Sequence, residues 1–421
     1  MAAYALAFVM QLALAGCGKT ESDHVTLKMW AIGREAEVVP VMLADFERTH
    51  PGIHVDVQAL PLTAAHEKLL TAFAGEALPD IGQIGNTWLP ELATLGALQP
   101  LQSLVDTSKV IEESDYFPGI WATNVIDGQL YGVPWYVDTR LLFYRKDLLA
   151  QAGFAESPHT WDEWQRALAA IKKNAGEKKY AILLPINEYE PLLNLAIQEP
   201  DPLLRDNDTR GNFESAGFRR AFAFYIDMFR ENWAPPMSAT QISNVWDEFS
   251  NGFYAFYISG PWSIGNFQLR LPERLKDDWG TAPLPGPDGP GAAVGGGSSL
   301  VLFKQSRHPR EVWQLIEFLS TPAQQLRFHE LCGDLPPRRS AWKDAALAND
   351  PYAKAFRDQL DRVKPAPMVP EWERIAQELR LAAERAIRGG ESTDKVLQEL
   401  DEHTDRILEK RRWMLSRERK R

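Results

Sequence analysis

The segment VTLKMWAIGREAEVVPVMLADFERTHPGIHVDVQAL, residues 25–60, decides the fold class of this chain. Residues 25–32 are rich in strand-forming side chains and predict a β-strand. Apolar residues then recur at helical spacing until Pro51 and Gly52 interrupt the pattern, and residues 53–61 alternate as a second strand does. A strand, a helix and a strand in this order predict a βαβ unit, and therefore a parallel sheet.

The same alternation continues downstream with a further helix and then a short buried strand over residues 80–85. In sheets of this kind, ligand sites lie beyond the carboxyl ends of the strands. Asn86, Thr87 and Trp88 follow the strand directly, so we predict that they line a site. The alternatives are a helix cap made by Asn86 or Thr87, and a core position for Trp88.

Length and composition restrict the classes of protein to consider. A chain of 421 residues is long enough for two domains with separate cores. The net charge of -11, with no basic run in the interior, argues against a nucleic-acid partner, since such binding depends on clustered Lys and Arg. The chain has 14 Trp, and flat indole rings are often used on ligands as well as in cores.

From about residue 135 the pattern changes, and it predicts a second α/β lobe. A helix is expected after Thr160, because Glu163 three residues later completes a capping box. An apolar strand is expected to stop at Gly260–Trp262. Residues 283–299 are dense in Gly and Pro and predict a loop, whereas the chain beyond about residue 350 reads as helical.

The first 20 residues, MAAYALAFVMQLALAGCGKT, resemble a secretory signal. The segment from Leu14 to Cys17 resembles the lipobox of bacterial lipoproteins, so Cys17 is predicted to carry a lipid that anchors the mature protein to a membrane. No Lys or Arg precedes the apolar run, and a buried N-terminal element is the alternative. With Cys17 lipidated, Cys332 stands alone and no disulfide is expected.

Signatures of catalysis and of metal binding are weak. His50 and His54 are the closest pair of histidines, but Pro51 and Gly52 separate them, so they cannot share one helix face as zinc ligands. No G-x-S-x-G motif occurs, and no spacing of the acidic residues selects a catalytic pair. We therefore expect no catalytic residues, no metal and no cofactor.

Several short segments in a particular order carry a family resemblance. They are PDIGQIGNTWLPELATLGAL, DGQLYGVPWYVDTRLLFYRKDLL, TWDEW, AFYISGPW, GGGSSLVLFKQSRHPREVWQLIEFLSTPAQQ and LPPRR. In this order they resemble the extracellular solute-binding proteins of ABC importers, of the class that binds maltose, trehalose and related oligosaccharides. The resemblance implies a two-lobe periplasmic binding protein fold, with mixed sheets flanked by helices and a ligand in the cleft between the lobes.

The resemblance also implies how the chain is divided and what it does. The crossings between the lobes are expected near residues 137–144, 295–300 and 333–339. We expect a monomeric receptor in the periplasm or at the cell surface that delivers a di- or oligosaccharide to an ABC permease and is not an enzyme. The predicted division is residues 1–24 for the lipoprotein signal and linker, 25–137 for lobe 1, 138–297 for lobe 2, 298–335 for the return to lobe 1, and 336–421 for C-terminal helices mainly in lobe 2.

Ligand-binding residues are predicted on both sides of the first crossing. Glu35 follows the first strand and could accept from sugar hydroxyls, although a charge in the first helical turn explains it equally well. Tyr136 and Asp138 are expected at the floor of the cleft, one as a ring and the other as a carboxylate. Arg140 either contacts the ligand or holds Asp138 in place.

Further candidates come from later in the chain. Trp262 is expected against the sugar or, alternatively, in the core, and Gly296 and Gly297 either let the backbone approach the ligand or form a flexible hinge. Arg338 matches an arginine that reaches the sugar in maltose and trehalose binders, with Arg339 or a surface pair as alternatives. Tyr189 and Trp246 are weaker candidates, and Trp246 also suits a helical core.

Two other functions stay open at this point. One is an extracellular glycoside hydrolase that uses Asp138 and a second carboxylate such as Glu35. The other keeps the fold and changes the solute to a glycerophosphodiester, a polyamine or a peptide.

Overall fold

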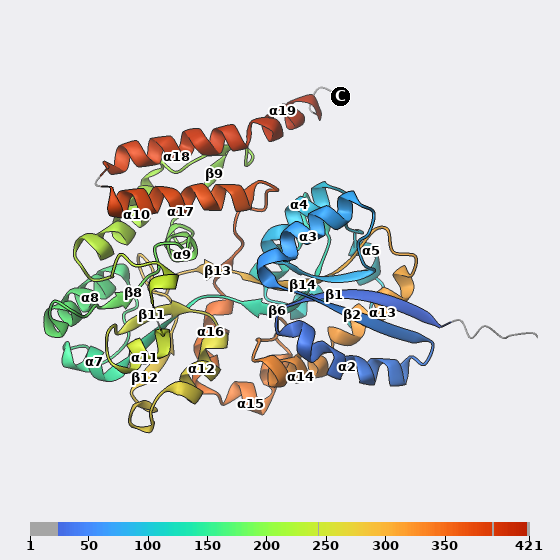
Figure 1. The fold of residues 1–421 in the computed structure, drawn as a ribbon, viewed down its shortest axis with the longest axis horizontal. Helices are drawn as coiled ribbons and strands as arrows, with labels where there is room; N and C mark the ends of the chain where they lie inside the picture. The colour runs from blue at the N-terminus through green and yellow to red at the C-terminus, as the bar shows by residue number, and fades with distance from the viewer. Residues whose placement is uncertain (1–23, 243, 390, 419–421) are drawn as a thin grey trace, which may run out of the picture.

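The computed structural model describes residues 24–242, 244–389 and 391–418. Two α/β lobes lie side by side and are connected through the middle of the molecule, and the last helices lie over one of them (Figure 1). The prediction of a lipobox at Cys17 falls outside the described residues.

Lobe 1 is built on a five-stranded sheet in the order β2-β1-β3-β14-β6. Its strands are β1 (Val25–Ile32), β2 (Ile53–Leu60), β3 (Ile81–Gly85), β6 (Val133–Asp138) and β14 (Gly296–Leu302). The first three are parallel, as the βαβ pattern predicts, whereas β14 runs antiparallel to both β3 and β6. The sheet is therefore mixed, because its last strand arrives from the far lobe.

Helices cover both faces of this sheet, and the inner strands β3 and β14 are buried along most of their length, whereas the edge strand β2 is largely exposed. They are α2 (Glu35–Thr49), α3 (Leu62–Ala74), α4 (Leu89–Thr94), α5 (Gln102–Val105), α6 (Pro118–Ala122), α13 (Pro309–Leu319) and α14 (Pro322–Cys332), with a small hairpin of β4 (Val125–Ile126) and β5 (Gln129–Leu130). In α2, the residues Val39, Leu43 and Phe46 recur at helical spacing and pack in one core with Leu27 and Met29 of β1.

Lobe 2 contains a four-stranded sheet in the order β12-β7-β11-β8. Its strands are β7 (Leu141–Arg145), β8 (Ile182–Leu183), β11 (Phe256–Ser259) and β12 (Trp279–Ala282), and its helices are α7 (Lys146–Gln151), α8 (Trp161–Ala175), α9 (Glu190–Ala196), α10 (Ala216–Arg230), α11 (Val245–Ser250), α12 (Trp262–Arg270), α15 (Ala345–Ala348) and α16 (Pro351–Leu360). The capping box of Thr160 and Glu163 opens α8, as predicted.

Three C-terminal helices follow, α17 (Trp372–Arg388), α18 (Thr393–Ile407) and α19 (Glu409–Glu418). The first two share the core of lobe 2 with α10. A short hairpin of β9 (Leu204–Arg205) and β10 (Arg210–Gly211) is tied to α18, where Asp405 accepts from the backbone N–H of Gly211 at 3.0 Å. These helices lie over lobe 2 in Figure 1, at the red end of the chain.

The lobes are connected at closely spaced points. Strand β6 of lobe 1 leads through Thr139 and Arg140 into β7 of lobe 2, and β13 (Ala293–Val294) leads through Gly295 into β14. Beside them the backbone N–H of Val137 donates to the carbonyl of Leu335 at 2.9 Å. The lobe 1 strands extend slightly past the predicted boundaries, because β6 includes Asp138 and β14 begins at Gly296.

Gly297 has a backbone conformation that this crossing requires. Its φ is +110°, and a Cβ atom at this position would lie 2.3 Å from the carbonyl oxygen of Tyr136. Residues 296–297 were predicted as part of a Gly-rich loop, but here they are strand residues that pair with Val137 and Asp138 of β6. Glycine is thus needed because two strands approach closely.

Replacement of Gly297 by alanine is expected to lower the free energy of unfolding by at least ~2 kcal/mol. The added methyl group would strain a backbone with positive φ and would collide with the carbonyl oxygen of Tyr136. Urea denaturation measures the loss as a shift in the unfolding midpoint. Gly289→Ala is the control, since a Cβ there meets nothing within 4 Å. Equal midpoints for the two variants would contradict this account of the crossing.

The third connection contains a partly buried carboxyl group, Asp334. Asp334 accepts a weak hydrogen bond from the Cys332 thiol, with 3.2 Å between Sγ and Oδ2. Burial raises the pKa of Asp334 to about 7, and the negative charge of nearby Glu35 adds to this effect. The native protein therefore keeps a proton on this group at pH values where the unfolded chain has lost it.

This proton makes stability depend on pH. Between the ordinary pKa of 3.8 and about 7, the native state binds more protons than the unfolded state, so the free energy of unfolding should fall as the pH rises through this range. Asp334→Asn should flatten this part of the stability profile, whereas Asp56→Asn, at an exposed carboxylate, should leave it unchanged. Thermal unfolding from pH 4 to pH 8 checks this, and an unaltered slope in Asp334→Asn would refute it.

Candidate functional site

A cavity of about 490 Å³ lies between the two lobes, beside the crossings. Its size suits a small organic solute. The lining residues come from both lobes and from the crossings between them. They are Ile32, Gly33, Arg34, Glu35, Leu62, Gln83, Gly85, Asn86, Thr87, Trp88, Tyr136, Asp138, Arg140, Tyr189, Glu190, Asn194, Val294, Gly295, Gly296, Gly297 and Ser298.

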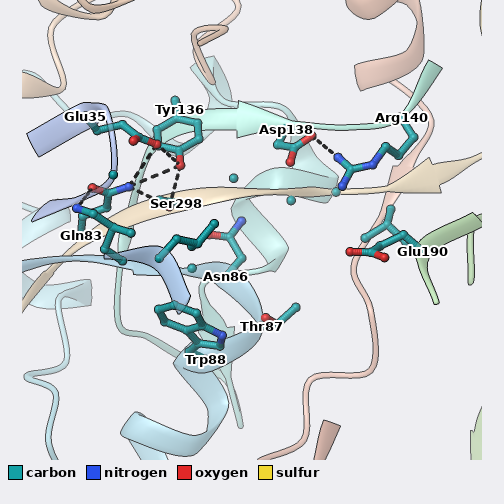
Figure 2. A pocket seen from close by; sticks show the side chains of 18 of the residues that line it. Glu35, Gln83, Asn86, Thr87, Trp88, Tyr136, Asp138, Arg140, Glu190 and Ser298 are labelled. Carbon is teal, nitrogen blue, oxygen red and sulfur yellow. Dashed lines mark hydrogen bonds and ion pairs between the residues drawn. The ribbon is translucent and has the colours of Figure 1, made fainter. Parts of the chain in front are cut away.

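On the lobe 1 side, one hydrogen-bond network joins four segments of the chain (Figure 2). The hydroxyl of Tyr136 donates to Oε1 of Glu35 at 2.7 Å, and the hydroxyl of Ser298 donates to Oη of Tyr136 at 3.0 Å. The amide of buried Gln83 lies 3.3 Å from both hydroxyl oxygens, while its Oε1 accepts from the backbone of Ile32 at 2.8 Å. This wall is therefore held in shape before any ligand arrives.

Glu35 lies at the start of α2, directly after the turn at Gly33 and Arg34. Its hydrogen bonds to Tyr136 and Gln83 both use Oε1, so in the described part of the chain Oε2 stays available to accept from a ligand. Burial raises the pKa of Tyr136, and the charge of Glu35 raises it further. The phenol therefore remains a hydrogen-bond donor throughout the neutral range.

Asn86, Thr87 and Trp88 follow β3 at its carboxyl end, where the sequence predicts them, and all three line the cavity. The amide of Asn86 is already used, because it donates to Thr123 at 2.8 Å and accepts from Ser299 at 3.1 Å. Trp88 presents its ring to the cavity, and the ring of His66 packs against it with 5.0 Å between the ring centroids. Trp88 can thus offer a flat face, whereas Asn86 mainly holds the strand end in place.

An ion pair lies where the first crossing leaves lobe 1. Arg140 donates to Asp138 at 2.5 Å (Figure 2). Its guanidinium also lies over the ring of Trp262, 4.8 Å from the ring centroid. Burial opposes the charge of Arg140, but Asp138 and Glu190 more than offset this, so the pKa of Arg140 is raised. The structure thus contains the contact in which Arg140 holds Asp138, and it also places both side chains at the cavity.

Lobe 2 supplies Tyr189, Glu190 and Asn194 from the start of α9. Asn194 is buried, and its Oδ1 accepts from the backbone N–H of Val294 at 2.8 Å, which ties this helix to the second crossing. The predicted glycines Gly296 and Gly297 line the cavity beside these residues. Lobe 2 therefore faces the lobe 1 network with a carboxylate and a ring.

Three predicted residues do not line this cavity. Trp262 is the first residue of α12 and is 42% exposed, but it reaches the site only through its contact with Arg140. Trp246 packs edge-on against Phe267 at 5.1 Å, which agrees with the alternative that it belongs to the core.

Arg338 is placed differently from the prediction. It is 7% exposed, and its guanidinium donates to Asp115 at 2.7 Å and to the carbonyl of Ser320 at 2.9 Å. Both contacts are within lobe 1, so a structural ion pair occupies this side chain in place of a ligand. The neighbouring Arg339 pairs with Asp361 at 2.9 Å.

Several lining residues were missed in the sequence. Gln83 is the one polar side chain in the short apolar strand 81–85, and this was a usable signal. Glu190 and Asn194 stand four residues apart on one helix, which places them on one face. Arg34, Ser298 and Leu62 carried no distinguishing pattern.

No group of His, Cys, Asp and Glu that could hold a metal ion occurs among the described residues. Likewise, none of the helices described there is both long and apolar enough to cross a membrane.

Comparison with known proteins extends these observations. A solved structure of the sugar-binding protein MalE from the phytopathogen Xanthomonas citri is 59% identical, with a TM-score of 0.91, over 93% of this chain and 99% of that one. Maltose-bound MalE3 of T. maritima is 26% identical, with a TM-score of 0.75, over 90% of this chain and 99% of that one. The diacetylchitobiose binding protein DasA of Streptomyces coelicolor is 25% identical over 86% of this chain and 87% of its own.

These structures confirm the predicted two-lobe periplasmic binding protein fold. Residues 33–326 match the family described as bacterial extracellular solute-binding protein, which is more than half of the chain. Proteins of this family bind solutes, in agreement with the prediction that this chain is not an enzyme. The chain belongs to the bacterial extracellular solute-binding proteins.

Proposed function

We propose that this protein is the receptor of an ABC importer and captures a di- or oligosaccharide of the maltose or trehalose type. The observation that carries the proposal is the composition of the interlobe cavity. Rings of Trp88, Tyr136 and Tyr189 line it together with the carboxylates of Glu35 and Glu190. Flat apolar faces suit the C–H side of pyranose rings, and carboxylates are strong acceptors for sugar hydroxyls.

The charge balance of the cavity favours a neutral solute. Its ionisable lining consists of three carboxylates and two guanidinium groups, and Asp138 is neutralised by Arg140 at 2.5 Å. A glycerophosphodiester would need a cation to bind its phosphate. Arg140 is already paired with Asp138, and Arg34, which donates to the carbonyl of Leu331 at 3.2 Å, lies beside the carboxylate of Glu35 in the lining, so a phosphate there would meet a negative charge as well. A polyamine remains the second candidate, because Glu35 and Glu190 face the same space and could bind an ammonium group at each end.

Binding is proposed to work by closure of the lobes. The lobe 1 wall is held by the Glu35–Tyr136 network, whereas Glu190 moves with lobe 2, so a solute that contacts both stabilises the closed form. The permease would then recognise that form.

We further propose that the receptor is monomeric, that Cys17 carries its lipid anchor, and that it functions in the periplasm or at the cell surface. The similarity to a MalE protein supports the choice of sugar.

A thermal-shift panel tests the choice of solute. Maltose, trehalose and maltotriose should raise the unfolding midpoint by several degrees at 100 times Kd, since binding to the native state alone contributes about 2.7 kcal/mol there. Spermidine and glycerophosphocholine should leave it unchanged. A shift with spermidine and with no sugar would overturn the saccharide proposal.

Product analysis after incubation with the same sugars should show no hydrolysis. Turnover that depends on Asp138 would contradict the proposal that this protein is a receptor.

Glu35→Gln tests the proposed role of the carboxylate. Loss of a charged acceptor should weaken sugar binding by roughly 10- to 100-fold, with little change in the unfolding midpoint of the free protein. Intrinsic Trp fluorescence or calorimetry measures the affinity. Glu37→Gln is the matched control, because Glu37 is an exposed residue in the first turn of the same helix. If both variants bind like the parent protein, Glu35 does not contact the sugar.

A further inference from the structure

The final helix, α19, presents an exposed face with no role in the proposed sugar site. Lys410, Trp413, Met414 and Arg417 are all exposed, and their spacing of three, four and seven residues places them on one side of the helix. Trp413 is 53% exposed and Met414 39%, which makes them two of the few large apolar side chains at the surface. Arg417 lies over the Trp413 ring at 4.0 Å. We refer to these four residues as the α19 face.

The opposite side of α19 is fastened to lobe 2. Arg412 donates to the carbonyls of Thr209 and Asp405, at 2.6 Å in each case. Leu415 is half-buried on the same side. The helix, which follows α18 at the red end of the chain (Figure 1), is therefore held in a defined orientation. The four exposed side chains of the α19 face thus form a fixed surface.

The charge of this end is opposite to that of the protein as a whole. Residues 410–421 contain seven basic residues and one acidic residue, while the complete chain has a net charge of -11. The helix dipole accounts for cations in the last turn only, and Lys410 lies in the first turn of α19. A concentrated positive charge on an otherwise acidic protein indicates a negatively charged partner.

We propose that the α19 face binds the surface of a membrane that contains anionic phospholipids. Trp is the side chain best suited to the headgroup region, where its ring is buried and its N–H stays hydrated. Lys410 and Arg417 flank Trp413 and Met414, so lipid phosphates can be contacted while the two apolar side chains enter between headgroups. The contact lies on the surface and is reversible, and it would set the orientation of the receptor relative to the membrane.

Vesicle flotation tests this proposal on the full chain with Cys17→Ser in every protein, so that no lipid can be attached at residue 17. The parent should float with vesicles of phosphatidylglycerol and phosphatidylcholine and much less with phosphatidylcholine alone, and added salt should weaken the binding. Lys410→Gln together with Arg417→Gln should lower the partition coefficient on anionic vesicles by on the order of 20-fold. Trp413→Ala should lower it severalfold.

The matched control is Arg166→Gln with Lys173→Gln, which removes two exposed cations at the same seven-residue spacing on α8. This variant should bind anionic vesicles like the parent. Equal binding of the parent to both kinds of vesicle, or no loss in the Lys410 and Arg417 variant, overturns the proposal. Sedimentation velocity tests a second outcome, in which the parent self-associates, does not bind vesicles, and loses its self-association in the Lys410 and Arg417 variant. That outcome would assign the α19 face to contact with a second copy and would also overturn the membrane proposal. Sugar affinity should not change in any of these variants, so the result is independent of the proposed transport function.

Discussion

The antiparallel pairing of β6 with β14 is the constraint on which the arrangement of the two lobes depends. It places the first crossing, which leaves lobe 1 at Asp138, directly beside the second, which enters lobe 1 at Gly296. The bond from Val137 to Leu335 adds the third connection on the other side of β6. Connections that lie this close together can act as one hinge, because each needs only a small change in backbone angles when the lobes move.

The same pairing positions the lobe 1 side of the cavity. Tyr136 and Ser298 face one another across β6 and β14, and their hydroxyls meet the amide of Gln83 from β3 and the carboxylate of Glu35 from α2. Four segments are thereby fixed relative to one another through side chains that also line the cavity. Such a wall loses little entropy on binding, which favours affinity for a polar ligand.

The lobe 2 side is positioned in a different way. The side chain of Asn194 accepts a hydrogen bond from the backbone N–H of Val294, so α9 is attached to the second crossing and not to the lobe 1 sheet. Glu190 and Tyr189 at the start of α9 therefore change their distance from Glu35 whenever the hinge moves. The Asp138–Arg140 pair lies at the first crossing itself, where each charge is neutralised by the other.

Local pattern in the sequence was enough to determine the two-lobe α/β class, the first βαβ unit, the cap of α8 and the placement of Asn86–Trp88 at a strand end. These features depend on periodicity and on turn chemistry within a few residues, so they can be read without knowing distant contacts. The prediction of Tyr136 and Asp138 at the cleft depended instead on the family resemblance, which implied a crossing near residues 137–144.

Only the tertiary structure decided which polar side chains meet. Gln83 stands out locally as a polar side chain in an apolar strand, but its contact with Ser298, 215 positions away, cannot be read from a local pattern. The same holds for Arg338, which Asp115 holds inside lobe 1 from 223 positions away. The need for glycine at 297 likewise comes from the carbonyl of Tyr136 on a distant strand. Hydrogen bonds and close backbone contacts between remote segments form only when the sheet register is set, and this register is a property of the whole fold.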